Sequence, residues 1–283
     1  MLLIADGGST KCDWILLDEE KQVLEKTQTK GLNPSVFSLE TLEERLCSNE
    51  ILKKYAEKIQ QVDFYGAGCG TPLPKEKLRK VLHSFFKKSQ VNVFEDTVAA
   101  VRAVTHEPGI VCILGTGSNA CYFDGKEVNV PIASLGYVLM DEASGNYFGK
   151  KLIQDYYYHK MPKKIAEEFE KKFNLDPDEI KSNLYQKENP NAYLASFASF
   201  IFTNSQLSDY FYNLILEGIQ LFIENRVLTI TESKKVPVHF VGSIAHFSSE
   251  IIADCLKTHN LAVGKIIQHP IEELTNYYRT NGI

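Results

Sequence analysis

The chain has 283 residues, enough for two domains of ordinary size, and 44% hydrophobic with 24% charged residues is typical of a globular protein. A net charge of −5, with basic residues scattered among acidic ones, argues against a nucleic-acid partner. No apolar run approaches the roughly 18 residues that span a bilayer, so we expect a cytoplasmic protein with no membrane partner. The six cysteines are dispersed without a C-x-x-C pair, which favours buried free thiols over metal ligands or disulfides.

The first part of the chain predicts strands followed by alternating helices and strands. An apolar run ends in a glycine-rich turn and resumes on the other side, which indicates a β-hairpin. Apolar periodicity and turn residues place the remaining elements. In chain order we expect strands over 2–6, 12–18 and 23–29, a helix over 39–60, a strand over 62–65, a helix from Pro72, a strand over 91–94 and a helix over 97–105.

The breaker at 106–109 is followed by a second hairpin with its own glycine turn. We expect strands over 110–114, 119–123 and 127–130, helices across 142–230, a strand over 236–241, a helix over 248–257, a strand over 262–267 and a helix from Pro270. The repeated hairpin suggests an ancient duplication. We therefore predict a small N-terminal lobe over residues 1–108 and a larger lobe over 109–283, with the terminal helix at about 270–280 returning to the first lobe.

The run Asp6-Gly-Gly-Ser-Thr-Lys11 forms the first turn. Glycines allow backbone N–H groups to close on a phosphate, and hydroxyl and ammonium groups add donors. The predicted phosphate-binding residues of this turn are Gly7, Gly8, Ser9, Thr10 and Lys11. Asp6, at the end of a buried strand, is the candidate Mg²⁺ residue, acting through water. The alternative is an ordinary hairpin turn.

The second turn, Gly115-Thr116-Gly117, formally matches the dinucleotide fingerprint G-x-G-x-x-A. In that motif the glycines open a helix, whereas a strand is expected here, so the Rossmann interpretation fails. No P-loop sequence occurs in the chain. We expect a second phosphate-binding hairpin that faces the first across a cleft. Gly242-Ser243 follows another strand in the same way, and we expect it to let the nucleoside of ATP lie close to the backbone.

Two aspartates have a catalytic and a structural interpretation. Asp96 lies where a strand gives way to a helix, at the sheet edge where ligands of α/β folds bind. It is a candidate general base, or it caps the helix that begins at Thr97. Asp141 precedes a helix within a loop of small residues, where it clamps a ligand or serves as the helix N-cap.

Together these segments resemble the BadF/BadG/BcrA/BcrD-type ATPase and N-acetylglucosamine kinase family, within the superfamily of sugar kinases, heat-shock ATPases and actin. The resemblance covers almost the whole chain. It implies an α/β, two-lobed actin-like ATPase (ribonuclease H-like) fold, with duplicated β-sheet lobes, helices on both faces, and ATP and Mg²⁺ as cofactors. The matching segments are Asp6–Lys11, Glu95-Asp96, Gly115–Asn119, Leu135–Glu142 and Val241–Ser243.

The resemblance also implies an activity, an ATP-dependent transfer of phosphate to N-acetylglucosamine or a close relative at the C6 hydroxyl, with Asp96 accepting the proton. It implies that Asn33, Ser118, Asn119 and Asp141 surround the sugar, and that the protein is a homodimer. Two departures are visible. Relatives carry Gly-Asp-Glu-Gly-Ser where this chain has Met140-Asp-Glu-Ala-Ser144, and a sugar-side tryptophan of some members is absent.

Two other functions stay open. The family also contains ATPases that activate partner enzymes through a cysteine-bound iron–sulfur cluster. Cys12 and Cys121 lie near the two glycine turns, but neither resembles a cluster-ligand motif. A non-catalytic sugar or ATP sensor would keep the phosphate turns without a base, and the presence of Asp96 argues against it.

Overall fold

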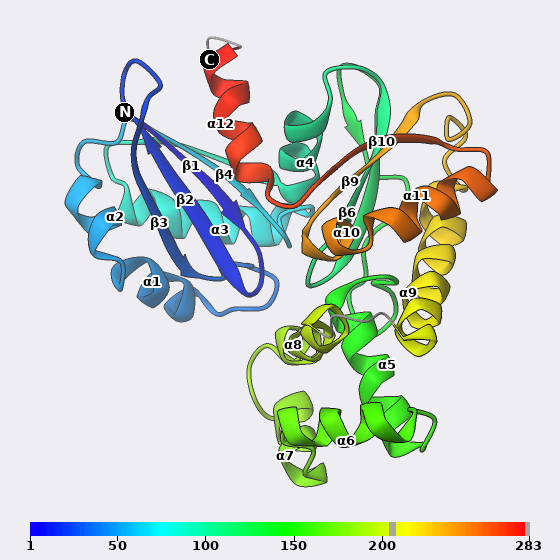
Figure 1. The fold of residues 1–283 in the computed structure, drawn as a ribbon. Coiled ribbons are helices and arrows are strands. Elements are labelled where there is room, and N and C mark those ends of the chain that lie inside the picture. The colour runs from blue at the N-terminus through cyan, green and yellow to red at the C-terminus, as the bar shows by residue number, and fades with distance from the viewer. Residues whose placement is uncertain (204–207, 281–283) are drawn as a thin grey trace. The chain divides into compact units, whose positions relative to one another are not determined.

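The structure, a computed structural model, describes residues 1–203 and 208–280. The chain divides into two compact units (Figure 1). Unit 1 comprises Met1–Val104 together with the C-terminal segment from His269, and unit 2 comprises Thr105–Gln268. The C-terminal segment therefore belongs to the unit formed by the start of the chain.

Unit 1 is built on a five-stranded mixed sheet with the order β3-β2-β1-β4-β5. β1, β2 and β3 run antiparallel as successive neighbours, and β4 and β5 continue the sheet parallel to β1. Its elements are β1 (Leu2–Gly7), β2 (Lys11–Leu17), β3 (Val23–Lys30), α1 (Leu39–Cys47), α2 (Glu50–Tyr55), β4 (Gln61–Gly66), α3 (Pro72–Phe85), β5 (Gln90–Glu95), α4 (Asp96–Val104) and α12 (Pro270–Thr280).

Helices cover both faces of this sheet. Successive strand residues point to opposite faces, so Leu3 and Ala5 of β1 enter the core that contains residues of α1, α2 and α3. Leu2 and Ile4 enter the core that contains residues of α4 and α12. The central strand is consequently a continuous apolar run from Leu2 to Ala5, as expected for a strand covered on both sides.

The terminal helix α12 is bound to the sheet by buried polar groups as well as apolar ones. The Tyr278 hydroxyl donates to Asp63 Oδ2 at 2.5 Å and lies 2.5 Å from the Tyr65 hydroxyl. Asn92 Nδ2 donates to Asp63 Oδ1 at 2.7 Å, and Arg102 donates to the Tyr65 hydroxyl. These contacts connect α12 with β4, β5 and α4.

Unit 2 repeats the topology of unit 1. Its sheet has the order β8-β7-β6-β9-β10, with β6, β7 and β8 antiparallel and β9 and β10 parallel to β6. Its elements are β6 (Gly109–Leu114), β7 (Ser118–Phe123), β8 (Val128–Asn129), α5 (Gly145–Tyr157), α6 (Lys163–Lys172), α7 (Pro177–Tyr185), α8 (Pro190–Thr203), α9 (Asp209–Phe222), the π-helix η1 (Ile223–Val227), β9 (Pro237–Val241), α10 (Ser243–Phe247), α11 (Ser249–Thr258) and β10 (Ala262–Ile267). The shared order agrees with the duplication inferred from the two hairpins.

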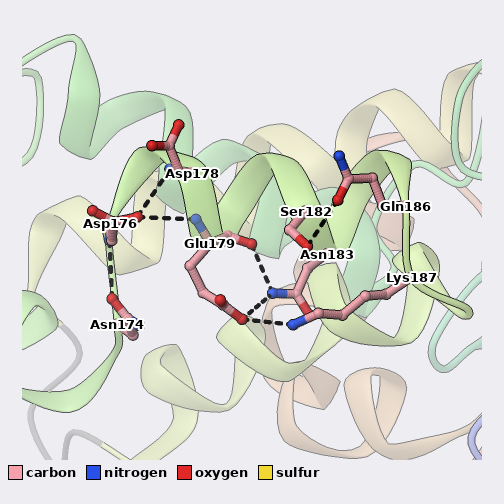
Figure 2. Close-up of polar contacts among 8 residues, drawn as sticks. All are labelled: Asn174, Asp176, Asp178, Glu179, Ser182, Asn183, Gln186 and Lys187. Atoms are coloured by element: carbon pink, nitrogen blue, oxygen red, sulfur yellow. Dashed lines mark hydrogen bonds and ion pairs between the residues drawn. The ribbon is translucent and has the colours of Figure 1, made fainter.

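The helices of unit 2 pack closely, and a side chain caps the N-terminus of α5, α7 and α9. α5 crosses α8 with its glycines at the contact, where a Cβ on Gly149 would lie 1.8 Å from the Leu194 carbonyl oxygen. α7 begins at the N-cap Asp176, whose Oδ1 accepts from two backbone N–H groups (Figure 2). Asn183 of this helix and Lys187, which follows it, both donate to Glu179 Oε1, at 2.8 and 2.7 Å.

Some element boundaries differ from those predicted. The helix expected over 39–60 is two helices, because Asn49 accepts from the Leu52 N–H and starts α2. The strand expected over 127–130 is reduced to β8, and the short α10 precedes the helix expected at Ser248. Cys47 is an exposed free thiol, whereas the other five cysteines are buried and free. Within the described ranges, no helix has the length and apolar character needed to span a bilayer.

Candidate functional site

The first glycine turn joins β1 to β2 and is supported by the chain after β3. Gly8 N–H donates to the Lys11 carbonyl at 2.8 Å, which closes the turn. Gly31 N–H donates to Thr10 O at 3.0 Å, and Leu32 N–H donates to Gly8 O at 3.1 Å. The Lys11 ammonium forms an ion pair with Asp13 at 2.8 Å and half of its side chain stays accessible to solvent.

Asn33 connects this turn to a second loop of unit 1. It is buried, its Nδ2 donates to Ser9 Oγ at 2.8 Å, and its Oδ1 accepts from Ser35 N–H at 2.9 Å. Gly68, in the loop after β4, has a φ of +80°, and a Cβ there would lie 2.0 Å from Asn33 Oδ1. The sequence thus supplies glycine where a side chain would displace Asn33.

Two partly buried aspartates lie near this turn, at the end of β1 and at the start of α4. Burial, reinforced by Asp13, raises the pKa of Asp6 to about 7, and Lys11 opposes this shift. Burial, then the charges of Glu95 and Asp6, raises the pKa of Asp96 to about 7. The charge of Asp6 therefore contributes to the raised pKa of Asp96. A carboxylate with a pKa near 7 is suited to accept a proton at neutral pH.

Asp96 also contacts the start of its own helix. α4 begins at Asp96 itself, one residue before the predicted start. Hydrogen bonds from the backbone N–H groups of Thr97 and Asp96 partly offset the rise in its pKa. The capping interpretation and the general-base interpretation are compatible with this geometry.

The glycine-rich loop after β4 was not assigned a role from sequence, although it borders the acidic residues. A Cβ on Gly70 would lie 2.6 Å from Glu95 Oε1, so the loop backbone lies against this carboxylate. Burial raises the pKa of Glu95, and burial, then Asp96, raises the pKa of the Cys69 thiol to about 12. The run of glycines that follows the strand is the sequence signal that could have marked this loop as part of the site.

The second glycine turn joins β6 to β7. Gly115 N–H donates to Gly117 O at 3.0 Å, and β7 continues antiparallel to β6 with Ser118 opposite Leu114. A strand follows the turn, so the rejection of the Rossmann interpretation is confirmed. The first two N–H groups of α5, from Gly145 and Asn146, donate to the Gly115 and Thr116 carbonyls at 2.8 and 3.0 Å.

Asp141 lies against this turn. Ser118 N–H donates to Asp141 Oδ1 at 3.3 Å, and Asn146 Nδ2 donates to Asp141 Oδ2 at 2.9 Å. Burial raises the pKa of Asp141, whereas Asn146, Ser118 and Arg226 lower it. The alternative that Asp141 is the helix N-cap is wrong. Ser144 is the N-cap of α5, because its hydroxyl accepts from the Tyr147 N–H.

The structure separates Ser118 from Asn119 although they are adjacent in sequence. Both are buried in β7 and, as successive strand residues, point to opposite faces of the sheet. The Ser118 hydroxyl has no hydrogen-bond partner among the described residues, whereas Asn119 Oδ1 accepts from the Ala120 N–H at 2.9 Å. Of these two described residues, Ser118 is the one that hydrogen-bonds Asp141.

Gly242 and Ser243 follow β9 and lie beside the second turn. Gly242 has a φ of +121°, and a Cβ there would lie 2.3 Å from the Leu114 carbonyl oxygen. Ser243 is exposed at the first position of α10. The Gly115 turn, the Asp141 loop and Gly242 therefore meet in unit 2 at the carboxyl ends of β6 and β9, the edge where open α/β sheets bind ligands.

Arg226 was not predicted from the sequence but supports the loop that carries Asp141. It is buried in the short π-helix η1, a type of distortion frequent at functional sites. Its guanidinium donates to Ile132 O at 3.0 Å and lies 3.2 Å from the Met140 sulfur. No local sequence signal marks it, since a single arginine in a helical segment is ordinarily exposed.

The sequence profile of the BadF/BadG/BcrA/BcrD ATPase family matches residues 5–276, which include most of both units. The chain belongs to this family. The resemblance drawn from the spaced motifs is therefore confirmed. None of the curated protein sequences compared matches the chain significantly.

Solved structures agree with membership of the BadF/BadG/BcrA/BcrD ATPase family. A protein of Porphyromonas gingivalis, provisionally named an N-acetylglucosamine kinase, is 35% identical, with 100% of both chains covered and a TM-score of 0.90. A Chromobacterium violaceum protein with the same provisional name is 14% identical, with 98% of each chain covered and a TM-score of 0.72.

A ROK family glucokinase from Streptomyces griseus, solved with glucose and AMPPNP, is 12% identical, with 98% of this chain and 97% of that chain covered and a TM-score of 0.61. At such low identity the last two structures establish the fold alone. The predicted fold class, duplicated actin-like α/β lobes, is confirmed by these structures and by the two equivalent sheets.

Proposed function

We propose that the chain is an ATP-dependent kinase that phosphorylates an amino sugar, N-acetylglucosamine or a close relative, at the C6 hydroxyl. The observation that carries the proposal is Asp96, a partly buried carboxylate after β5 whose pKa is raised to about 7. The provisional name of the P. gingivalis protein, 35% identical over its full length, supports the reaction class.

The nucleotide is assigned to the glycine turns. Backbone N–H groups and hydroxyls of the first turn, with the half-accessible Lys11 ammonium, are the proposed phosphate donors in unit 1. The second turn provides the proposed phosphate donors in unit 2. The exposed Ser243, after Gly242, is the proposed nucleoside contact. The full assignment is Gly7, Gly8, Ser9, Thr10, Lys11, Gly115, Thr116 and Gly117 to phosphate, and Gly242 and Ser243 to adenosine.

Asp6 is proposed to hold Mg²⁺ through water. Among the residues described, no set of three or more His, Cys, Asp or Glu side chains forms a metal cage. Mg²⁺ ordinarily needs only one or two carboxylates, completed by water and substrate phosphates. The raised pKa of Asp6 fits this role, because burial and Asp13 disfavour its ionised form more than Lys11 favours it, and a bound cation would stabilise that form. When bound, Mg²⁺ neutralises charge on the transferring phosphate.

The acceptor is assigned to Asn33, Ser118, Asn119 and Asp141. The unpartnered Ser118 hydroxyl beside the Asp141 carboxylate supports this part of the proposal, since a buried hydroxyl without a partner is costly and a sugar hydroxyl would satisfy it. Asn119 is the least supported member, because it lies on the opposite face of the sheet from Ser118. Asp96 orients the acceptor hydroxyl and accepts its proton as the phosphate is transferred.

The alternative of an ATPase that activates a partner enzyme through an iron–sulfur cluster finds less support. Cys12 and Cys121 have no exposed surface, and Cys121 Sγ donates to the Val111 carbonyl at 3.5 Å. A cluster at a subunit interface would need accessible thiolates. The homodimer expected from the family stays a prediction.

A panel of sugars tests the proposal. Purified protein is incubated with Mg·ATP and N-acetylglucosamine, N-acetylmuramic acid, glucosamine, N-acetylmannosamine or glucose, and ADP release and phosphosugar mass are followed. We expect sugar-dependent ADP release with one of the first three, and a product phosphorylated at C6 by fragmentation. Slow ATP hydrolysis without any phosphosugar would support the activator or sensor alternative instead.

A further inference from the structure

Asn146 joins three segments of unit 2 that lie beside one another at the sheet edge. Only 1% of the residue is exposed. Its Nδ2 donates to Asp141 Oδ2 at 2.9 Å, its Oδ1 accepts from the Ser144 hydroxyl at 3.0 Å, and its backbone N–H donates to Thr116 O at 3.0 Å. The side chain and the backbone N–H of Asn146 thus connect the second glycine turn, the Asp141 loop and the N-terminus of α5.

The orientation of the Asn146 amide follows from chemistry. An ionised carboxylate can only accept hydrogen bonds, so the NH₂ group faces Asp141 and the carbonyl faces Ser144. The Ser144 hydroxyl in turn accepts from the Tyr147 N–H at 3.2 Å. The arrangement is polarised in one direction, from the helix N-terminus through Ser144 and Asn146 to Asp141.

The Asp141 loop depends on such support because its backbone is strained. Asp141 has a φ of +74° and Ala143 a φ of +57°, in the left-handed region that non-glycine residues seldom adopt. Strained residues persist only where surrounding contacts hold them, and they gather at functional sites. The bond from Asn146 is the shortest that is made to the Asp141 carboxylate among the described residues.

We infer that Asn146 is a positioning residue, which fixes the Asp141 carboxylate against the Gly115–Ser118 turn so that the two segments act as one element. The inference rests on the proposed function, in which Asp141 binds the acceptor and the turn binds phosphate. It predicts that loss of the Asn146 amide weakens acceptor binding through Asp141, although Asn146 itself does not contact the sugar.

The principal variant is Asn146→Asp, which keeps the shape but places a second acceptor against Asp141. The matched control is Asn183→Asp. Asn183 Nδ2 also donates to a carboxylate, Glu179 Oε1 at 2.8 Å, on α7 (Figure 2). Neither Asn183 nor Glu179 is among the residues assigned to the site. Asn146→Ser is a second, uncharged variant in case Asn146→Asp does not fold.

Kinetics with N-acetylglucosamine and Mg·ATP provide the first measurement. Loss of a hydrogen bond to a charged group, worth about 1.5–3 kcal/mol, corresponds to a rise of roughly 10–100-fold in the acceptor KM. The KM for ATP should change much less, and Asn183→Asp should resemble the wild type. In the Asp141→Asn background, Asn146→Ser should raise the acceptor KM little further, because the effects of substitutions at two residues in contact are not additive. Independent, additive effects would overturn the inference.

Hydrogen exchange provides a measurement that does not need activity. Asn146→Asp should increase amide exchange in both 115–118 and 139–146, and Asn183→Asp should change neither. The double variant Asp141→Asn/Asn146→Asp, in which the two residue types are swapped, should restore protection in both segments, because the donor and the acceptor are then reversed. This double variant should not restore the acceptor KM, because residue 141 no longer carries a carboxylate. Increased exchange in one segment alone, or in neither, would contradict the coupling.

The two proposals fail differently. If the wild type phosphorylates none of the sugars while exchange responds in both segments, the proposed function is refuted and the structural coupling stands. If the wild type is active but exchange and acceptor KM are unchanged in both Asn146 variants, the positioning role is refuted and the proposed function is unaffected.

Discussion

The substitution Tyr278→Phe tests whether α12 is an integral part of unit 1. It removes only a hydroxyl, which donates to Asp63 Oδ2 and lies 2.5 Å from the Tyr65 hydroxyl. The aromatic ring remains, so the apolar contacts of α12 are unchanged. Asp63 still accepts from Asn92 and Gln61, and Tyr65 still accepts from Arg102. The loss is therefore chiefly that of one hydrogen bond to a charged group.

Such a bond contributes about 1.5–3 kcal/mol, so we expect the free energy of unfolding of unit 1 to fall by about 2 kcal/mol. With a urea slope of about 2 kcal/mol per molar, the midpoint should fall by roughly 1 M. Trp14, the single tryptophan of the chain, is buried in the unit 1 core and reports this transition by fluorescence.

The control is Tyr185→Phe, at a side chain that is 82% exposed. This change should alter stability by less than about 0.5 kcal/mol. If Tyr278→Phe shifts the midpoint no more than the control does, α12 does not contribute to the stability of unit 1 through this network, and the reasoning is refuted.

Three further predictions concern packing, pH and nucleotide binding. Gly149→Ala places a Cβ 1.8 Å from the Leu194 carbonyl and should lower stability by about 1–3 kcal/mol in thermal unfolding, and an unchanged midpoint would contradict the close α5–α8 crossing. Burial, then Lys265, lowers the pKa of His239, so the unfolded state binds more protons below its ordinary pKa near 6.5. Stability should therefore fall as pH drops through this value, less so in His239→Gln, and equal pH dependence would refute the assignment. Asp6→Ala should abolish Mg²⁺-dependent ATP binding in calorimetry with circular dichroism unchanged, whereas equal affinity would remove Asp6 from the site.

The strands and both glycine turns could be predicted because their signals are local. Short apolar runs define β1 and β2, and the glycines between them indicate a turn. The similar hairpin at Gly115 indicated the duplication that the two sheets now display. The candidate base could also be predicted, because Asp96 follows a strand directly.

Long-range side-chain contacts could not be predicted from the same patterns. Tyr278 and Asp63 are 215 residues apart, and no local pattern pairs them. Asp141 was interpreted as a possible N-cap because it precedes a helix, but two left-handed residues turn the chain so that Ser144 caps α5. Asn146 looks like an ordinary residue of the first helical turn until the Asp141 loop is placed beside it.

The most direct test of the central claim compares wild type and Asp96→Asn with the sugar that the panel identifies. Asparagine keeps the shape and part of the hydrogen bonding but cannot accept the acceptor proton. We expect phosphosugar formation, measured by mass, to fall by roughly 10²–10⁴-fold, with ATP affinity in calorimetry largely unchanged. Undiminished phosphosugar formation by Asp96→Asn would show that Asp96 only supports the start of α4 and that the proposed base is wrong.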